Sequence, residues 1–347
     1  TATELYNGGV WVTSSNMATG RRYVGSGPSG TYSSALIAGG RIGGVNSALT
    51  EEWNFGVYSY SAAAWASGGN MNTARYYLAG VGTQTAALGF GGTTTTGLSS
   101  GTESYNGTSW TSNPTTLNTT RYALSGAGTQ TAALAAGGRP PGGASGVTEL
   151  WNGSSWTTSP ATLGTARYGI RGVGTQTSAL VFGGFNGVSL QSASESFNGT
   201  TWTATPSLNT AKNTRGGAGT QTAALAFGGS PPSNATESWN GSSWTSVNSM
   251  NTARFFGSGS GTGTQTLAIA FGGSTDPGDT ATGATEQWNG TSWSNLPSMS
   301  TARSRLGQSG TQPAALAFGG FNGSNLSNTE EWTTETATAS ASTLTTS

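Results

Sequence analysis

The sequence predicts an all-β protein, a β-propeller of seven four-stranded antiparallel blades. An apolar segment that ends in a glycine pair occurs seven times, at intervals of 44 to 52 residues. Most copies are followed by a segment with Glu, an aromatic residue and an Asn-Gly pair, which is typical of tight hairpins. The 12 Trp, 11 Phe and 10 Tyr can supply a core although only 7% of the residues are charged. A single small sheet cannot bury both of its faces, so we expect the units to stack in a ring.

The composition limits the partners. The formal net charge is zero, so we expect no basic surface for nucleic acid. No segment approaches the roughly 20 apolar residues of a membrane helix, so we expect no membrane insertion. The absence of Cys leaves the redox compartment open. Because the chain begins at Thr1 rather than Met, we expect a processed or partial product.

Three recurring features, which we call anchors, divide the chain into seven units. They are the glycine pair, a Glu with an aromatic residue two positions later, and Met or Leu followed by x-Thr-x and a cation. The glycine pairs end at Gly40, Gly92, Gly138, Gly184, Gly229, Gly273 and Gly320; the acidic anchors are Glu4, Glu51, Glu103, Glu149, Glu195, Glu237, Glu286 and Glu330; and the anchor cations are Arg21, Arg75, Arg121, Arg167, Lys212, Arg254 and Arg303.

The order of the anchors predicts four short strands in each unit. In the fifth unit, an irregular stretch and a Gly-Thr-Gln-Thr turn precede a strand in which Leu225 and Phe227 alternate with Ala224 and Ala226. This strand is apolar on both faces, as expected between neighbouring sheets. The next strand turns at Asn-Gly and returns through Trp244. The glycine pair allows backbone conformations and close approaches that a Cβ would block.

These residues resemble the kelch repeat. The matching features are Ala-Leu-Ala-Phe-Gly-Gly, Trp239, Trp244 and Met-Asn-Thr-Ala-Arg, and the resemblance runs from Thr3 to about Trp332. The chain departs from the repeat in two ways, because its aromatic residues are only five positions apart and a Glu precedes the first of them. The resemblance implies a propeller but no single function, since kelch propellers include enzymes and binding modules.

The ends of the chain leave two ways to complete the ring. The N-terminal hairpin around Tyr6 keeps the aromatic pair and the Asn-Gly turn, whereas the segment after Trp332 has lost both. We therefore expect the ring to be closed by the N-terminal strands; in the alternative, the Trp332 segment completes the last blade. The expected domains are a propeller over residues 1–332 and a Thr/Ser/Ala-rich tail or linker over 333–347.

The anchor charges recur once per unit, which indicates structural pairs, because an unpaired buried charge is costly. The alternative is a charged ring around the central channel. The residues that we expect to form structural pairs are Glu103, Arg121, Glu149, Arg167, Glu237, Arg254, Glu286 and Arg303.

The sequence contains few residues of the types that commonly act in catalysis. Copper oxidases with a kelch-type propeller need His and Cys, and the chain has neither. Sialidase-like propellers need several Asp-containing turns, whereas Asp276 and Asp279 are the only aspartates and share one loop. These two could offer oxygens to calcium, but a Pro/Gly loop with two Asp is better explained as a turn. We expect no catalytic residue, no metal and no cofactor.

Recognition is expected where the units differ. The Gly-Thr-Gln-Thr and Asn-Gly turns hardly vary, whereas the segments between the glycine pair and the Glu strand differ in length and content. Variable loops on a rigid scaffold commonly carry binding, although unconstrained drift would look the same. The best-equipped contacts in these loops are Arg41, Arg139, Phe185, Asp276, Asp279 and Phe321. Residues at the starts of the blades could join them or pack between blades: Arg22, Tyr23, Tyr76, Tyr122, Tyr168 and Phe255.

One irregularity lies on the opposite face. Between Asn54 and Trp65 the second hairpin is longer than its counterparts and contains Phe55, Tyr58 and Tyr60. An exposed aromatic insertion favours contact with a partner chain or another subunit. It could also fold back over the propeller.

The scarcity of catalytic side chains favours a non-enzymatic protein, and a resemblance of the repeat implies a structural or attachment protein of a virus particle, located in the virion or outside the cell. The repeat style resembles predicted proteins of marine tailed phages, which implies a fibre, tail or capsid-decoration module. The expected partners are other virion proteins or a glycan or receptor on the host surface, with a homo-oligomer within the assembly as a further possibility. The alternatives are an extracellular carbohydrate-binding module and, least favoured, a propeller-type glycan-active enzyme.

Overall fold

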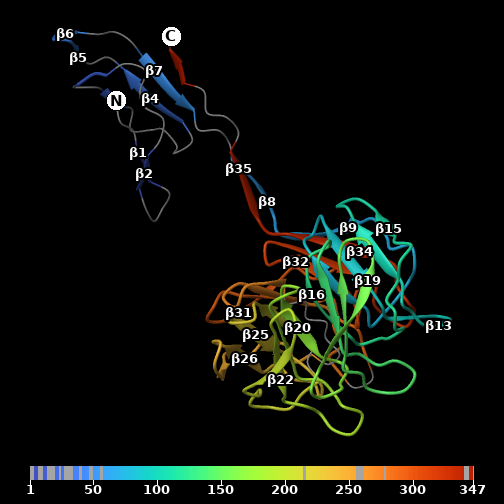
Figure 1. Ribbon diagram of the computed structural model, residues 1–347. Coiled ribbons are helices and arrows are strands. Elements are labelled where there is room, and N and C mark those ends of the chain that lie inside the picture. The colour runs from blue at the N-terminus through green and yellow to red at the C-terminus, as the bar shows by residue number, and fades with distance from the viewer. Residues whose placement is uncertain are drawn as a thin grey trace. The chain divides into compact units, whose positions relative to one another are not determined.

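The computed structural model describes residues 4–6, 11–13, 20–22, 25–26, 34–38, 41–46, 50–54, 58–213, 216–254, 262–276, 279–339 and 344–346. The regular elements among these residues are all strands (Figure 1). No helix of membrane-spanning length and hydropathy occurs in this part of the chain. The chain divides into a terminal unit, Thr1–Ala62 with Glu335–Ser347, and a propeller unit, Ala63–Thr334.

Six four-stranded antiparallel sheets form the propeller unit, and in five of them the strands follow one another along the chain. Blade 1 is β10 (Ala79–Gly82), β11 (Ala87–Phe90), β14 (Thr102–Tyr105) and β15 (Trp110–Ser112); blade 2 is β16 (Ser125–Gly128), β17 (Ala133–Ala136), β18 (Val147–Trp151) and β19 (Trp156–Thr162); blade 3 is β20 (Arg171–Gly174), β21 (Ala179–Phe182), β22 (Ser194–Phe197) and β23 (Trp202–Thr205).

The second half of the propeller unit repeats this order up to its last sheet. That sheet takes its outer strand from the beginning of the unit. Blade 4 is β24 (Gly216–Gly219), β25 (Ala224–Phe227), β26 (Thr236–Trp239) and β27 (Trp244–Val247); blade 5 is β28 (Thr262–Gly263), β29 (Ala268–Phe271), β30 (Thr285–Trp288) and β31 (Trp293–Leu296); blade 6 is β32 (Gly307–Thr311), β33 (Ala314–Phe318), β34 (Thr329–Thr333) and β9 (Ala64–Gly68).

The expectation of seven blades is wrong, because the first of the seven glycine-pair strands lies in the terminal unit. There, β3 (Gly25–Ser26), β4 (Ser34–Ala38), β7 (Thr50–Asn54) and β36 (Leu344–Thr346) form a separate four-stranded sheet. Similar repeats make similar sheets, but the number of sheets in one ring depends on how they pack against each other. The number of repeats in the sequence therefore exceeds the number of blades in the ring by one.

Closure by the N-terminal hairpin is not confirmed. In the terminal unit β1 (Glu4–Tyr6) pairs with β2 (Trp11–Thr13), whereas the outer strand of blade 6 is β9, which places Trp65 opposite Trp332. The Trp332 segment thus belongs to the last blade, as in the alternative weighed above. The remaining pairs are β5 (Arg41–Ile42) with β6 (Val45–Asn46), β8 (Tyr58–Ser61) with β35 (Thr336–Ala339) and, in the propeller unit, β12 (Thr93–Thr94) with β13 (Gly97–Leu98).

The expected tail and the expected hairpin insertion also take part in pairing. Residues 333–347 contain β35 and β36, each hydrogen-bonded to a strand from the first 61 residues. Asn54 and Trp65 do not share a hairpin, because Asn54 ends β7 in the terminal unit and Trp65 lies in β9 of the propeller unit. The segment between them is therefore where the chain passes from one unit to the other.

The core of the propeller unit lies between adjacent blades. In β17 every side chain is fully buried: Ala133 and Ala135 pack in a cluster with residues of blade 1, and Leu134 and Ala136 pack in a cluster with residues of blade 3. This alternation places one apolar row of the strand on each of its two faces, as the sequence pattern predicts.

The Trp of each outer strand ties its blade to the preceding one. Its indole Nε1 donates to a Thr or Ser hydroxyl on the third strand of the neighbour, as from Trp156 to Thr102 at 3.0 Å. The junction between blades 6 and 1 has the same bond, from Trp110 to Thr329 at 2.9 Å. Buried indole N–H groups need such acceptors, so this bond also sets the distance between neighbouring sheets.

The glycine pair adopts the backbone that the sequence predicted for it. In blade 2, Gly137 and Gly138 have φ values of 62° and 100°. A Cβ on Gly137 would lie 2.6 Å from the carbonyl oxygen of Arg167, so the strand could not pass the next blade so closely. Glycine is required at this position for both reasons.

Candidate functional site

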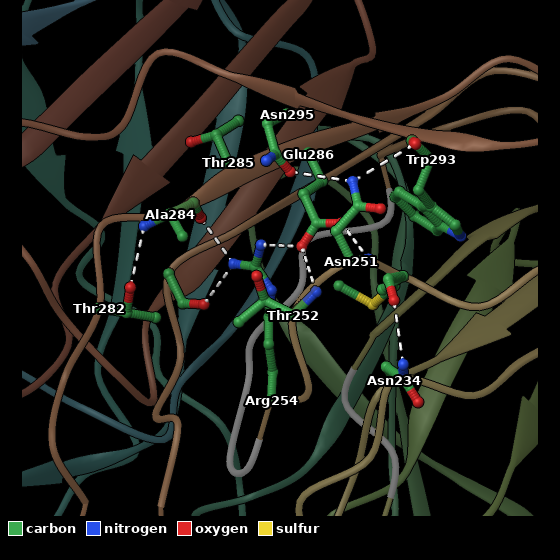
Figure 2. Close-up of polar contacts among 12 residues, drawn as sticks. Asn234, Asn251, Thr252, Arg254, Thr282, Ala284, Thr285, Glu286, Trp293 and Asn295 are labelled. Atoms are coloured by element: carbon green, nitrogen blue, oxygen red, sulfur yellow. Dashed lines mark hydrogen bonds and ion pairs between the residues drawn. The ribbon is translucent and has the colours of Figure 1, made fainter.

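Each anchor cation of the propeller unit forms an ion pair with one anchor Glu about 30 residues later in the chain. Figure 2 shows the pair in blade 5, where Arg254 Nη2 lies 2.7 Å from Glu286 Oε1. Arg254 Nη1 also donates to the carbonyl oxygens of Gly272 and Ala284, at 2.9 and 2.6 Å. The six pairs are Arg75–Glu103, Arg121–Glu149, Arg167–Glu195, Lys212–Glu237, Arg254–Glu286 and Arg303–Glu330.

The segment that leads to the cation wraps around the same carboxylate. In blade 5 the amide N–H groups of Asn251 and Thr252 donate to the two oxygens of Glu286, at 2.7 and 3.2 Å (Figure 2). Arg254 and Glu286 are both 1% exposed, and burial lowers the pKa of the Arg254 guanidinium while Glu286 opposes that shift. These charges are enclosed by protein, so they offer no surface to a ligand.

The two variable connections of a blade meet on one face of the propeller unit. The residue after the anchor cation forms an antiparallel bridge with the residue after the glycine pair, and we call this face the loop face. In blade 2, for example, Arg139 N donates to Tyr122 O at 2.8 Å and Tyr122 N donates to Arg139 O at 3.3 Å. The bridges are Tyr76–Thr93, Tyr122–Arg139, Tyr168–Phe185, Asn213–Ser230 and Ser304–Phe321.

The aromatic side chains at these bridged positions, together with Tyr77, form a continuous series of rings, which we call the aromatic arc. Neighbouring ring centroids along the arc lie 5.4 to 6.4 Å apart, within the range of aromatic contacts. The arc crosses from blade 6 through blades 1 and 2 to blade 3, in the order Phe321, Tyr76, Tyr77, Tyr122, Tyr168 and Phe185.

Two members of this face follow the bridged position by one residue and were missed by the sequence analysis. Tyr77 and Arg305 have positive φ values of 57° and 55°, in the left-handed region. Ala123 and Gly169 hold the equivalent places in blades 2 and 3, with φ values of 55° and 66°. Amide N–H groups link successive members, from Tyr77 to Arg305 O at 2.7 Å and from Ala123 to Tyr77 O at 2.9 Å. The backbone here is thus the same whichever side chain it carries.

Part of the arc lines an open pocket of about 470 Å³, which we call the aromatic pocket. This volume is within the range of about 300–1,000 Å³ that is typical of small-molecule sites. Arg139 lies in it, with its guanidinium carbon 5.2 Å from the centroid of the Tyr168 ring and its Nη1 donating to Tyr122 Oη at 3.0 Å. The lining residues are Tyr77, Tyr122, Ala123, Arg139, Tyr168, Phe185, Leu190, Asn213 and Ser230.

A second hollow adjoins the other end of the arc. Phe321 and Asp279 both line it. Arg305 Nη2 lies 2.8 Å from Asp279 Oδ2, and its guanidinium lies 4.9 Å from the centroid of the Tyr77 ring. Asp276 is not among the residues that line this hollow. Its Oδ1 accepts a hydrogen bond from Thr280 N at 3.1 Å, which stabilises the turn of its own loop.

The residues predicted to bind are therefore only partly brought together. Arg139 and Phe185 share the aromatic pocket, and Asp279 and Phe321 share the second hollow. Arg41 lies in the terminal unit, bridged to Arg22 as Arg139 is bridged to Tyr122. Tyr58 and Tyr60 lie in β8 opposite Ala339 and Ala337, whereas Tyr23, Phe55 and Phe255 lie outside the described residues.

The other pocket residues that the sequence analysis did not single out are Ala123, Leu190, Asn213 and Ser230. Asn213 follows the anchor Lys212 and occupies the place that Tyr122 and Tyr168 occupy in blades 2 and 3. The sequence thus shows that Asn213 is equivalent to Tyr122 and Tyr168, although its side chain is neither aromatic nor charged.

Comparison with known proteins adds no assignment. No protein-family model matches the chain, and a search of curated proteins finds no match.

Proposed function

We propose that this chain is a non-enzymatic recognition protein of a virus particle, and that its loop face binds a glycan on the host surface. The observation that carries the proposal is the aromatic arc with the pocket at one end. Aromatic rings pack against the C–H faces of sugars, while polar groups around them accept and donate hydrogen bonds to the hydroxyls.

At the positions of the arc, backbone atoms maintain the fold, and the side chains are available to bind a ligand. The bridge on the loop face is made by backbone atoms, and it is the same whether the side chains are Tyr and Phe, as in blade 3, or Asn and Ser, as in blade 4. Side chains at these positions can change without loss of the blade. This is the arrangement that lets a scaffold acquire a binding site.

Binding without catalysis agrees with the charges at the site. Glycoside hydrolysis commonly uses two carboxyl groups on either side of the scissile bond. Among the described residues that line the aromatic pocket and the second hollow, Asp279 is the one carboxylate, and it is already paired with Arg305. We therefore expect a bound glycan to be released unchanged.

The assignment to a virus particle, and to a kelch-like repeat, rests on the resemblances given above. The segment with Phe55, Tyr58 and Tyr60 remains our candidate for contact with a neighbouring virion protein. Mass spectrometry of purified particles, or a density map in which the chain is traced, tests this part of the proposal. A protein found only free in the medium would contradict it.

The binding proposal is tested by removing one ring from the pocket. Tyr168→Ala should weaken attachment to host cells and to a panel of surface glycans by tenfold or more, because it removes a stacking surface and the support of Arg139. Val188→Ala is the matched control, since Val188 is 88% exposed on the loop between Phe185 and Leu190 but does not line the pocket. Equal attachment by both variants would contradict the proposal, as would release of new reducing ends from a glycan.

A further inference from the structure

The aromatic pocket contains a cation that no carboxylate balances among the described residues. The Arg139 side chain is exposed, and its polar partner is the hydroxyl of Tyr122. A guanidinium has five N–H donors in a planar fork, so a ligand can still be bound through two parallel hydrogen bonds. Arg305 on the same face differs, because Asp279 pairs with it.

A buried acceptor lies in the same pocket. Asn213 Oδ1 is enclosed by protein and has no hydrogen-bond donor among the described residues. A buried acceptor without a donor costs about 1–3 kcal/mol, and a ligand hydroxyl would remove that cost. Because this oxygen has no accessible surface, a sugar hydroxyl reaches it when the Asn213 carboxamide turns toward the pocket.

Apolar groups form much of the remaining wall of the pocket. Tyr168, Phe185 and Leu190 line it beside Arg139, and the Tyr168 and Phe185 rings meet edge to face with centroids 5.6 Å apart. A ligand that fits these walls has a C–H face, a hydroxyl and an anionic group on one small ring. A neutral sugar would leave Arg139 without a counter-charge, and a phosphate dianion would be only half balanced by it.

We propose that the aromatic pocket selects an acidic sugar, a uronic acid unit of a glycan chain, whose carboxylate pairs with Arg139 and whose hydroxyl donates to Asn213. This inference rests on the proposed glycan-binding function and narrows its ligand class. The planar carboxylate matches the guanidinium fork, and the sugar ring packs on the aromatic wall.

The test uses the whole chain and matched pairs of oligosaccharides. Binding is measured by calorimetry to oligomers that contain galacturonate, glucuronate or mannuronate, each beside its carboxyl-reduced counterpart and a sulfated form of the reduced oligomer. At least one carboxylate form should bind ten- to a hundred-fold more tightly than its reduced counterpart, since a charge-assisted hydrogen bond contributes about 1.5–3 kcal/mol. Added salt should reduce this preference.

Arg139→Gln should lose the preference for the carboxylate while Arg139→Lys keeps part of it. Val188→Ala is the matched control, because Val188 is exposed beside the pocket without lining it and should leave the preference unchanged. Asn213→Ala should weaken the acidic and the reduced forms by the same factor, about two- to tenfold.

The inference is overturned if the acidic and reduced forms bind equally, if a sulfated form binds best, if Arg139→Gln keeps the preference, or if none of the oligomers binds. Attachment of Tyr168→Ala to host cells then separates the two proposals. A loss of attachment leaves glycan binding in place and removes only the acidic ligand, whereas unchanged attachment removes both.

Discussion

The buried ion pair is the residue-scale device that makes the repeat recognisable. Arg121 and Glu149 are both fully buried and 2.9 Å apart, and Arg121 Nη1 also donates to two carbonyl oxygens, of Gly137 and Val147. A buried charge is tolerated only with partners of this quality, so the sequence must supply Arg and Glu together in each blade.

Replacing Arg121 with Ala should destabilise the protein strongly. Glu149 would be left buried without its cation, and we expect the free energy of unfolding to fall by about 3–5 kcal/mol. The thermal midpoint measures this, with Arg139→Ala as the control, because Arg139 is an exposed arginine of the same blade. An unchanged midpoint with lost binding would instead favour a charged ring that serves a ligand.

A substitution at Lys212 should stabilise the protein instead. Among the six ion pairs, the pair in blade 4 is the one in which Lys stands in place of Arg. Lys212 Nζ lies 3.2 Å from Glu237 Oε1 and makes no hydrogen bond among the described residues, whereas Arg254 Nη1 donates to two carbonyl oxygens in blade 5. We expect Lys212→Arg to raise the free energy of unfolding by about 1–3 kcal/mol by adding charge-assisted hydrogen bonds. Denaturant titration measures it, and Arg167→Lys in blade 3 should show a loss; a destabilised Lys212→Arg variant would contradict the expectation.

Tyr105 gives a residue-scale prediction for pH. Burial, together with the hydrogen bond to Glu331, raises the pKa of its phenol to about 12 from an ordinary value of 10.0. The folded state thus holds this proton more tightly than the unfolded state, so its contribution to stability is present below pH 10 and is lost between about pH 10 and 12. The stability difference between the natural protein and Tyr105→Phe should be constant to about pH 9 and should shrink by pH 11. A constant difference over the whole range would contradict the assigned shift.

At the scale of the element, the Gly-Thr-Gln-Thr turn links neighbouring blades. Gly128 has a φ of 113°, Thr129 Oγ1 accepts from Ala132 N at 3.1 Å, and Gln130 reaches back to blade 1. Gln130 Nε2 donates to Ala87 O at 3.1 Å and to Tyr105 O at 2.6 Å. The near-constant sequence of this turn therefore has a structural explanation on the face opposite to the aromatic arc.

Gln130→Leu should lower the free energy of unfolding by about 1–3 kcal/mol, because two hydrogen bonds between blades 1 and 2 are lost. Thr131→Ala is the matched control, since Thr131 is exposed in the same turn and should change little. Denaturant titration of both variants measures the difference, and equal midpoints would show that the glutamine does not hold the blades together.

At the scale of the whole molecule, the propeller unit contains all the strands of its six blades. Its last blade needs β9, where Trp65 donates to Thr285 at 3.0 Å and packs on Phe271 with ring centroids 4.7 Å apart. We expect residues 63–334 to fold alone, with the thermal midpoint of the same transition in the full chain. A shorter form, residues 70–334, should unfold at a much lower temperature because blade 6 loses its outer strand. Similar midpoints for the two forms would contradict this account of blade 6.

The blade itself could be predicted from the sequence, because its causes are local. Alternating apolar residues, glycine pairs and Asn-Gly turns act within about 45 residues, and they place Leu134 and its neighbours between sheets as expected. In the Asn-Gly turns the Asn side chain also orders the loop, as where Asn106 Oδ1 accepts from Thr108 N and Ser109 N, both at 2.9 Å.

Part of the candidate site could also be predicted from the sequence. Arg139 and Phe185 were found because they follow glycine pairs, and Phe321 follows another. Tyr77 and Arg305 were missed because their role depends on a left-handed backbone and on rings from other blades, which no local pattern reveals.

By itself the sequence determined the all-β class, the four-stranded unit and the places of its variable loops, because these follow from contacts between residues close in the chain. Only the tertiary structure decided that six units share one ring, that β9 completes the last blade and that the first unit stands in a separate sheet. One sequence signal points to this division, since the first unit has Gly-Thr-Tyr-Ser where the others have Gly-Thr-Gln and so lacks the glutamine that links blades. The physical reason is that ring size and the aromatic arc arise from packing between sheets, which residues far apart in the chain create together.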